Sequence, residues 1–470
     1  MNFSFRGIWD MITGKSRGAN QVYRWSDRAA RWANYSKFFE CYHGRIYRGG
    51  TDGTYSYVNQ SQMKRLVFNF AVPICNTGAA WLAGPDVSFS VVTQGQEGES
   101  EDAIEARMEK DRMYGAKLSA IWDRSGSCNE FMDAALSCCI YGDVGITVRR
   151  QNSEAYIVFH EPGICDPYFS PHDSRVLDGM TIAYPVEERG ETVPYVEEWT
   201  RGVVTTTVGE NEPDVMVLKW AGDECPALWV RNEAVKGREF GVSDIDAPFQ
   251  AICEYDHIAG KQTRIIDYYS APAIVVKGGV DPDGTIEKNV RTVWTVAEGG
   301  DVKFLEWSGT APGVPEHLEL IRRGISEMTE IPEVAFGKVD QGFTHASGVS
   351  MKVLYGPLEN KIRRKRAQWG PALERAMWLA LRAEGVMDVP LSAIKINWGE
   401  CAPHSESEFL TDLETKMRLG LSSRTALREM QYTEDEIKMI ESERDSEQEK
   451  AAELEAKANP KPVPGKKEVK

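Results

Sequence analysis

The sequence contains one segment that resembles part of a phosphate-binding loop. Gly14, Lys15 and Ser16 have the order found at the end of such a loop. The loop also needs a glycine five residues before Gly14, where this chain has Trp9, and a preceding strand, which the sequence does not predict. Because backbone N–H groups at a strand-to-helix turn must surround the phosphates, we do not expect nucleotide binding here.

Residues with metal-ligating side chains occur, but their spacing does not form a site. Asp281 and Asp283 lie among glycines at 278–284, yet the further oxygen ligands of a calcium loop do not follow. Cys138 and Cys139 are adjacent late in an apolar segment, with no histidine at ligand spacing. The nine cysteines contain no C-x-x-C pair, which is typical of reduced, mostly buried thiols. We predict no metal site and no cofactor.

The seven histidines and the serines form no recognisable hydrolytic pattern. No H-E-x-x-H pair and no G-x-S-x-G turn occurs in the sequence. Carboxylate pairs are uninformative in a chain that has 71 Asp and Glu residues. The sequence therefore predicts a protein that is not an enzyme.

The charge balance limits the ways in which the chain can meet nucleic acid. The formal net charge is −16 and the isoelectric point is about 5.1. A protein that grips DNA through its phosphates is normally basic, so the acidity argues against tight DNA binding. The acidity does not exclude a surface past which DNA slides without being bound tightly.

Two basic segments could still contact DNA. Residues 417–430 superficially resemble a helix-turn-helix, with Gly420 in the turn and Arg424 and Arg428 on the second helix. Acidic residues on both sides would repel phosphates, so we interpret the segment as a hairpin of packed helices. Residues 361–366 form the strongest basic run. This run could bind acidic neighbours in an oligomer or encapsidated DNA, and a solvated charged face is an equally good reading.

The elements that must position any site begin with a mixed α/β half. Helical periodicity covers residues 26–42, 61–82, 102–122 and 129–141. Alternating apolar residues predict strands at 87–91 and 144–148, and about five short strands at 181–230 form an antiparallel meander. Residues 66–84 are the most membrane-like segment, but polar residues and Pro73 interrupt it, so we predict a buried helix.

The second half begins with a capping box at residues 243–246, which predicts the start of a helix. Residues 271–307 are strand-rich, with a tight hairpin turn at 298–301, and Pro315 opens a second helix. A loop at 331–346 separates it from a long helix at 347–384, in which Pro357 and Pro371 predict kinks or breaks. Acidic helices follow.

Four short segments match, in order, a known family. Residues 346–361 begin with Ala-Ser-Gly and resemble the start of that family's long helix, although Ser350 and Met351 are mild departures. Three further segments resemble points where the family's elements meet. They are the end of a helix at 76–84, the helix-to-strand junction at 134–148, which contains Tyr141, Gly142 and Asp143, and the entry to a helix at 241–245. Over residues 20–450 the chain resembles portal proteins of tailed bacteriophages, particularly the SPP1 type.

The resemblance implies an α+β portal fold, assembled as a ring around a central channel. It divides the chain into a wing (1–242), a first stem helix (243–269), a β-rich clip (270–314) and a second stem helix (315–331). A tunnel loop (332–345), a long wing helix with a return strand (346–399), a crown (400–445) and a disordered tail (446–470) complete it.

The resemblance also implies which residues meet DNA and partners. The tunnel loop would present Lys338, Asp340, Gln341, Gly342, Phe343, Thr344 and His345 to the duplex. Gly337 and Gly342 would let the loop move, Lys338 would slow the DNA, and Phe343 would either touch the duplex or pack within the ring. Lys261 and Arg264 on the first stem helix are further DNA contacts. Motor or adaptor proteins would dock on Asp281, Asp283, Glu287, Lys288 and Arg291 of the clip.

The implied function is a dodecameric ring at the unique capsid vertex, through which double-stranded DNA is packaged and ejected. The implied partners are further copies of the chain, the large subunit of terminase, a head-completion or adaptor protein, and the major capsid and scaffold proteins, with no membrane. The protein would belong to the virion and assemble in the cytoplasm of the bacterial host. The alternatives are another minor capsid or head-completion protein without a DNA channel, the packaging ATPase itself, and a transcription regulator.

Overall fold

The computed structural model describes the greater part of the chain, which divides into two compact units. The larger unit comprises residues 1–345 and 353–401, and the smaller one residues 346–352 and 402–470. The described residues are 22–46, 67–84, 87–95, 99–173, 176–188, 190–236, 238–270, 274–277, 301–304, 313–337, 348–399, 406–430, 437–440, 442 and 444. Among them, no helix has the length and apolar character needed to cross a membrane.

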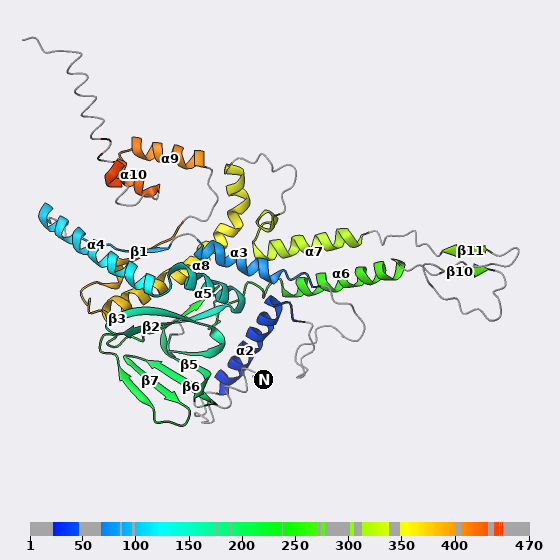
Figure 1. The fold of residues 1–470 in the computed structure, drawn as a ribbon, viewed down its shortest axis with the longest axis horizontal. Helices are drawn as coiled ribbons and strands as arrows, with labels where there is room; N and C mark the ends of the chain where they lie inside the picture. The colour runs from blue at the N-terminus through cyan, green and yellow to red at the C-terminus, as the bar shows by residue number, and fades with distance from the viewer. Residues whose placement is uncertain are drawn as a thin grey trace, which may run out of the picture. The chain divides into compact units, whose positions relative to one another are not determined.

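Four helices open the larger unit (Figure 1): α2 (Val22–Tyr42), α3 (Ala71–Ala83), α4 (Glu101–Arg124) and α5 (Ser127–Tyr141). The side chain of Ser100 caps α4 by accepting a hydrogen bond from the backbone N–H of Ala103. The helix predicted at 61–82 is confirmed in its second half, and α3 is buried as predicted for 66–84; residues 67–70 precede the helix, and 61–66 lie outside the described residues. The other three helices match their predicted ranges within four residues.

Two antiparallel sheets follow α5. Strands β2 (Asp143–Gln151), β3 (Glu154–His160) and β9 (Ala227–Arg231) form one in the order β3-β2-β9. The other is a five-stranded meander of β4 (Cys165–Phe169), β5 (Leu177–Glu188), β6 (Glu191–Thr200), β7 (Val203–Val208) and β8 (Asp214–Val217). The prediction that the meander extends to residue 230 was wrong for β9. That strand pairs with β2, Val230 opposite Val144, and its apolar side chains complete the core beneath α5.

Two smaller ladders join distant segments. Strand β1 (Ser88–Val91) pairs with β12 (Ile394–Asn397), more than 300 residues later. Strand β10 (Ile274–Lys277) pairs with β11 (Asp301–Phe304). The predicted turn at 298–300 lies outside the described residues. Among the described residues, short 3-10 helices occur at Pro162–Ile164, Glu333–Phe336 and Leu391–Ala393.

Three long helices form the rest of the larger unit: α6 (Phe249–Ser270), α7 (Val314–Thr329) and most of α8 (Gly348–Ala383). The predicted start of α7 at Pro315 is confirmed, because Gly313 takes a left-handed conformation and proline occupies the first helical turn. Helix α8 continues through Pro357 and Pro371, so neither proline breaks it.

The capping box predicted at residues 243–246 was wrong, since α6 begins only at Phe249. The hydroxyl of Ser243 donates to the carbonyl of Ile140 at 2.6 Å and accepts from the N–H of Ile245 at 3.1 Å. The serine therefore ties a turn to the end of α5, and this tertiary bond replaces the local helix cap.

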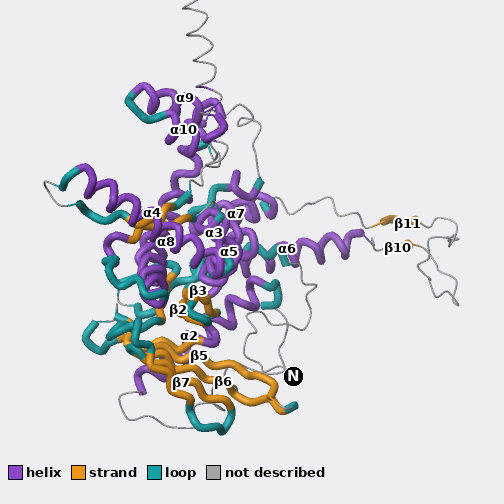
Figure 2. The backbone as a smooth tube through the Cα atoms, turned by 60° about the vertical axis from the view of Figure 1, so that its left-hand side comes forward, coloured by secondary structure: helices purple, strands orange, loops and turns teal. Residues whose placement is uncertain are grey.

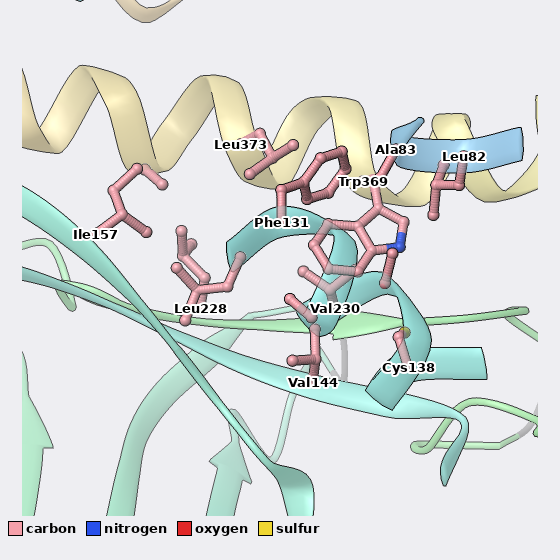
Figure 3. Packing of buried hydrophobic residues seen from close by; sticks show 14 of the residues in the cluster. Leu82, Ala83, Phe131, Cys138, Val144, Ile157, Leu228, Val230, Trp369 and Leu373 are labelled. Atoms are coloured by element: carbon pink, nitrogen blue, oxygen red, sulfur yellow. The ribbon is translucent and has the colours of Figure 1, made fainter. Parts of the chain in front are cut away.

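The core lies between α8, α5 and the β3-β2-β9 sheet (Figure 3). The ring of Trp369 on α8 meets that of Phe131 on α5 edge-on, with centroids 5.1 Å apart, and both are fully buried. Ile157 and Val144 project from the sheet toward them. This packing fixes the middle of α8 over the sheet by burial of large aromatic surfaces.

The smaller unit contains α9 (Glu406–Arg418) and α10 (Ser423–Glu429), which pack side by side (Figure 2). Gly420, with φ +111°, makes the turn between them. Leu413 and Ala426 are buried, and the hydroxyl of Ser422 accepts from the N–H of Thr425. The helix hairpin interpreted at residues 417–430 is present.

Candidate functional site

The structure places only part of the predicted DNA-contacting set. Lys261 is exposed on α6, and Arg264 lies one turn further along the same helix. The tunnel-loop residues Lys338 to His345 and the clip residues Asp281, Asp283, Glu287, Lys288 and Arg291 lie outside the described residues. Their predicted roles therefore remain predictions.

Two packed helices, α6 and α7, precede the predicted tunnel loop. Helices α6 and α7 pack against each other and lie side by side in Figure 1. Ile252 of α6 and Ile325 of α7 belong to the buried core. After α7 the chain turns at Glu330, forms the 3-10 helix Glu333–Phe336 and reaches Gly337 in a left-handed conformation. The segment that precedes the loop is thus anchored in the larger unit.

A buried carboxylate lies where the turn before α6 meets α8. Oδ2 of Asp244 is 2.6 Å from Nζ of Lys365, and Oδ1 is 3.3 Å from Nζ of Lys361. The side-chain amide of Asn232 donates to Oδ1 at 2.9 Å. The side chains of Asp244 and Lys365 are 1% and 0% exposed, so these charges interact without water between them.

The two lysines connect this carboxylate to two further helices. Lys361 donates to the carbonyl of Thr329, the last residue of α7, at 3.0 Å. Lys365 donates to Sγ of Cys139, near the end of α5, at 3.1 Å. Helix α3 also approaches the cluster, because a Cβ placed on Gly78 would lie only 2.8 Å from Oδ2 of Asp244. We call Asp244, Lys361 and Lys365 the buried charge cluster; it joins α3, α5, α7, α8 and the turn before α6.

The electrostatics favour the charged form of the carboxylate and of Lys365. Burial alone would raise the pKa of Asp244, but the charges of Lys361 and Lys365 hold that pKa well below its usual range. Burial alone would lower the pKa of Lys365, but Asp244 raises it. Burial raises the pKa of Cys139 to about 12, so its thiol stays protonated and unreactive. The cluster is an electrostatic contact rather than a proton-transfer site.

Both interpretations of the basic run at 361–366 were wrong for its two buried lysines. Lys361 and Lys365 lie inside the chain and cannot form a solvated face or reach DNA. Arg364, half-exposed, pairs with Glu330 at 2.6 Å and Glu233 at 3.5 Å. Arg366 donates to the carbonyl of Gly399 and lies over the ring of Trp398. Most side chains of the run therefore make ion pairs or hydrogen bonds with other segments of the same chain.

A second buried carboxylate, Asp143, follows Gly142 at the junction of α5 and β2. It accepts hydrogen bonds from the hydroxyl of Tyr35 at 2.8 Å, the indole of Trp229 at 3.0 Å and the N–H of Gly241 at 2.8 Å. Burial raises its pKa to about 6, although these hydrogen bonds oppose the rise. Its three donors come from α2, β9 and the segment before α6, so Asp143 fixes the junction by joining these parts of the chain.

Neither cluster contains the donor set of a metal centre. Within the described ranges, no group of three or more His, Cys, Asp and Glu side chains could hold a metal ion. A shallow pocket between α2, α5 and β3 is lined by apolar and acidic side chains, including Phe39, Glu130, Phe159 and Glu161. Its lining also includes His43 and His160, and the hydroxyl of Tyr141 there donates to the carboxylate of Glu161.

Residues 24–450 match the family described as phage portal protein, SPP1 Gp6-like. The chain belongs to this family. This portal protein accordingly belongs to a family of bacteriophage proteins whose role is structural. The resemblance noted on the four short segments is confirmed.

Solved structures give more distant similarities to this portal protein. The virion of a native gene transfer agent particle contains a chain with 10% identity and a TM-score of 0.47, covering 83% of this chain and 91% of that one. A neck of the native particle, computed with C12 symmetry, gives 11% identity and a TM-score of 0.43, with coverages of 79% and 88%. A neck of the empty particle, computed with C6 symmetry, gives 11% and 0.42, with coverages of 75% and 86%. No curated protein sequence matches significantly.

Proposed function

We propose that this portal protein assembles as a ring of about twelve copies, whose central channel carries double-stranded DNA during packaging and ejection. The observation that carries the proposal is the family match over residues 24–450. The order of elements supports it: α6, the β10-β11 ladder, α7, a segment at 338–347 and then α8. A helix, a β-rich clip, a second helix and a loop are the parts that a channel subunit requires.

The parts of the ring subunit can be assigned to these elements as proposals. We assign the stem to α6 and α7, the clip to the segment that contains β10 and β11, and the crown to residues 400–445, which include α9 and α10. The wing would comprise the helices and sheets before residue 243, together with α8 and β12. The proposed tunnel loop then connects α7 to α8.

The acidity of the chain suits a channel through which DNA moves. With a net charge of −16, few strong phosphate attachment points are expected along the lumen. We propose Lys338 as the main residue that slows the duplex and Lys261 on the exposed face of α6 as a weaker contact. Replacing Lys338 by Gln should speed DNA ejection from intact particles without changing ring formation. An unchanged ejection rate would remove Lys338 from the proposal.

The proposed docking surface for the terminase motor and the later head-completion protein is the clip. Asp281, Asp283, Glu287, Lys288 and Arg291 supply both signs of charge there, which suits successive partners on one surface. Reversing Asp281 and Asp283 to Lys should weaken terminase binding to purified rings. Equal binding by the variant would place the docking surface elsewhere.

Ring formation can be tested by electron microscopy of the purified protein, with its mass in solution measured alongside. Closed rings with a channel wide enough for a duplex, at about twelve times the 52.6 kDa chain mass, are expected. A chain that forms no rings even with scaffold and capsid proteins present would contradict the proposal. That outcome would favour a minor head protein without a channel.

A further inference from the structure

The buried charge cluster lies at a mechanically important position in the chain. Its three charged residues come from the turn before α6 and from the middle of α8, and Lys361 also binds the last residue of α7. Helices α6 and α7 are the two that we assign to the stem. The cluster therefore connects both stem helices to the long helix that follows the proposed tunnel loop.

The bond between Lys361 and α7 has a clear electrostatic basis. The carbonyl groups at the C-terminal end of a helix carry a partial negative charge, which a nearby ammonium stabilises. Asp244 forms ion pairs with two lysines, so its single negative charge cannot balance both of them. The carbonyl of Thr329 supplies part of the missing compensation. If the end of α7 moved away, Lys361 would keep a buried charge with less compensation, which is costly.

We propose that Asp244, Lys361 and Lys365 form a clamp that holds the end of α7, the entry to α6 and the middle of α8 as one rigid unit. This inference rests on the proposed function in assigning α6 and α7 to the stem, while the clamp itself is a property of the single chain. As a consequence, when α6 and α7 move, the middle of α8 moves with them. The three segments do not shift relative to one another at the cluster.

The geometry separates the roles of the two lysines. Lys361 binds α7, whereas Lys365 binds Asp244 and Cys139 on α5. Replacing Lys361 by Met should therefore release the end of α7 while the contact between Asp244 and Lys365 remains. Replacing Lys365 by Met should loosen the turn at residues 243–246 and leave the contact between Lys361 and Thr329 in place.

Amide hydrogen exchange of the full-length chain tests this separation. In Lys361→Met, exchange of the last turn of α7, residues 326–330, should accelerate by at least about tenfold, with α5 and β2 unchanged. Arg363→Gln is the matched control, because Arg363 is exposed on the same stretch of α8 and the substitution removes a positive charge outside the buried charge cluster. Lys361→Arg should restore slow exchange. Wild-type exchange at 326–330 in Lys361→Met, or an equal acceleration along the whole chain, would overturn the clamp.

A second measurement needs no variant, so it holds even if Lys361→Met fails to fold. In the wild-type chain at low denaturant, amides at 326–330 and at 244–246 should open together, with the same denaturant dependence. Independent opening of the two segments would overturn the clamp. Neither measurement requires DNA or ring formation, so failure of the clamp is distinguishable from failure of the proposed ring.

Discussion

Nζ of Lys365 lies 2.6 Å from Oδ2 of Asp244, although 121 residues separate them along the chain. Asp244 belongs to the turn before α6, and Lys365 belongs to the middle of α8. The contact therefore joins two segments that are far apart in the sequence. A buried ion pair of this kind gives little net stability relative to apolar packing, but removing one partner is costly. The pair therefore favours one arrangement of these segments over others.

Removing the carboxylate should be the most damaging single change in the cluster. Asp244→Asn leaves Lys361 and Lys365 buried without a negative partner, and we expect it to lower the free energy of unfolding by about 3–5 kcal/mol. Urea denaturation of the purified chain measures the effect. Asp246→Asn is the control, because Asp246 is exposed and its pair with Lys37 spans 3.7 Å, so about 1 kcal/mol or less is expected. Equal losses in the two variants would contradict the role of Asp244.

Gly78 tests how closely α3 approaches the same cluster. A Cβ at this position would lie 2.8 Å from Oδ2 of Asp244 and 3.3 Å from Nζ of Lys365, both held by hydrogen bonds. We expect Gly78→Ala to lower the free energy of unfolding by about 1–3 kcal/mol despite alanine's better helix propensity. Gly115 of α4 has open space around it, so Gly115→Ala should stabilise the chain by about 0.5–1 kcal/mol. Thermal unfolding of both variants should give shifts of opposite sign.

His160 should make stability depend on pH. Burial lowers its pKa from 6.5 to about 4, while its ring nitrogen lies 2.8 Å from the hydroxyl of Thr147. Below pH 6.5 the unfolded chain binds a proton that the folded chain does not, so stability falls as pH drops from about 6.5 to about 4. The slope contributed by this residue is at most about 1.4 kcal/mol per pH unit.

The measurement for His160 is the free energy of unfolding at several pH values for wild type and His160→Gln. The variant should lose less stability than wild type between pH 6.5 and 4. The comparison is needed because Asp143, whose pKa burial raises to about 6, acts in the opposite direction over part of this range. His317→Gln on the exposed face of α7 should keep the wild-type slope. A full slope in His160→Gln would contradict the prediction.

Much of the fold could be predicted because its signals are local. The signals that predict α4, α5 and α8, and the start of α7 at Pro315, come from residues close together in the sequence. The structure contains all four helices near their predicted ranges. The partner of β9 and the turn at Ser243 could not be predicted, because both depend on contacts with α5 and β2. Those contacts are made by segments distant in sequence.

The buried charge cluster was missed for a different reason. The apolar stripe of α8 includes Leu358, Ile362 and Trp369, and Lys361 and Lys365 occur at helical spacing from it. A lysine on the buried face of a helix is a signal that a carboxylate lies opposite. The sequence does not identify Asp244 as that carboxylate among 71 acidic residues. A run of basic residues is also typical of an exposed surface, so the sequence predicted an exposed segment at 361–366 rather than a buried one.

The central claim, that this portal protein provides the route for the genome, is tested by particle assembly with and without it. The measurement is the amount and length of nuclease-resistant DNA in particles formed from the other head proteins, terminase and genomic DNA. Particles assembled with the chain should protect genome-length DNA from nuclease. Particles assembled without it should protect no such DNA at any time, including the earliest time sampled. Protection of genome-length DNA at early times in particles that lack the chain would contradict the account and favour a head-completion role.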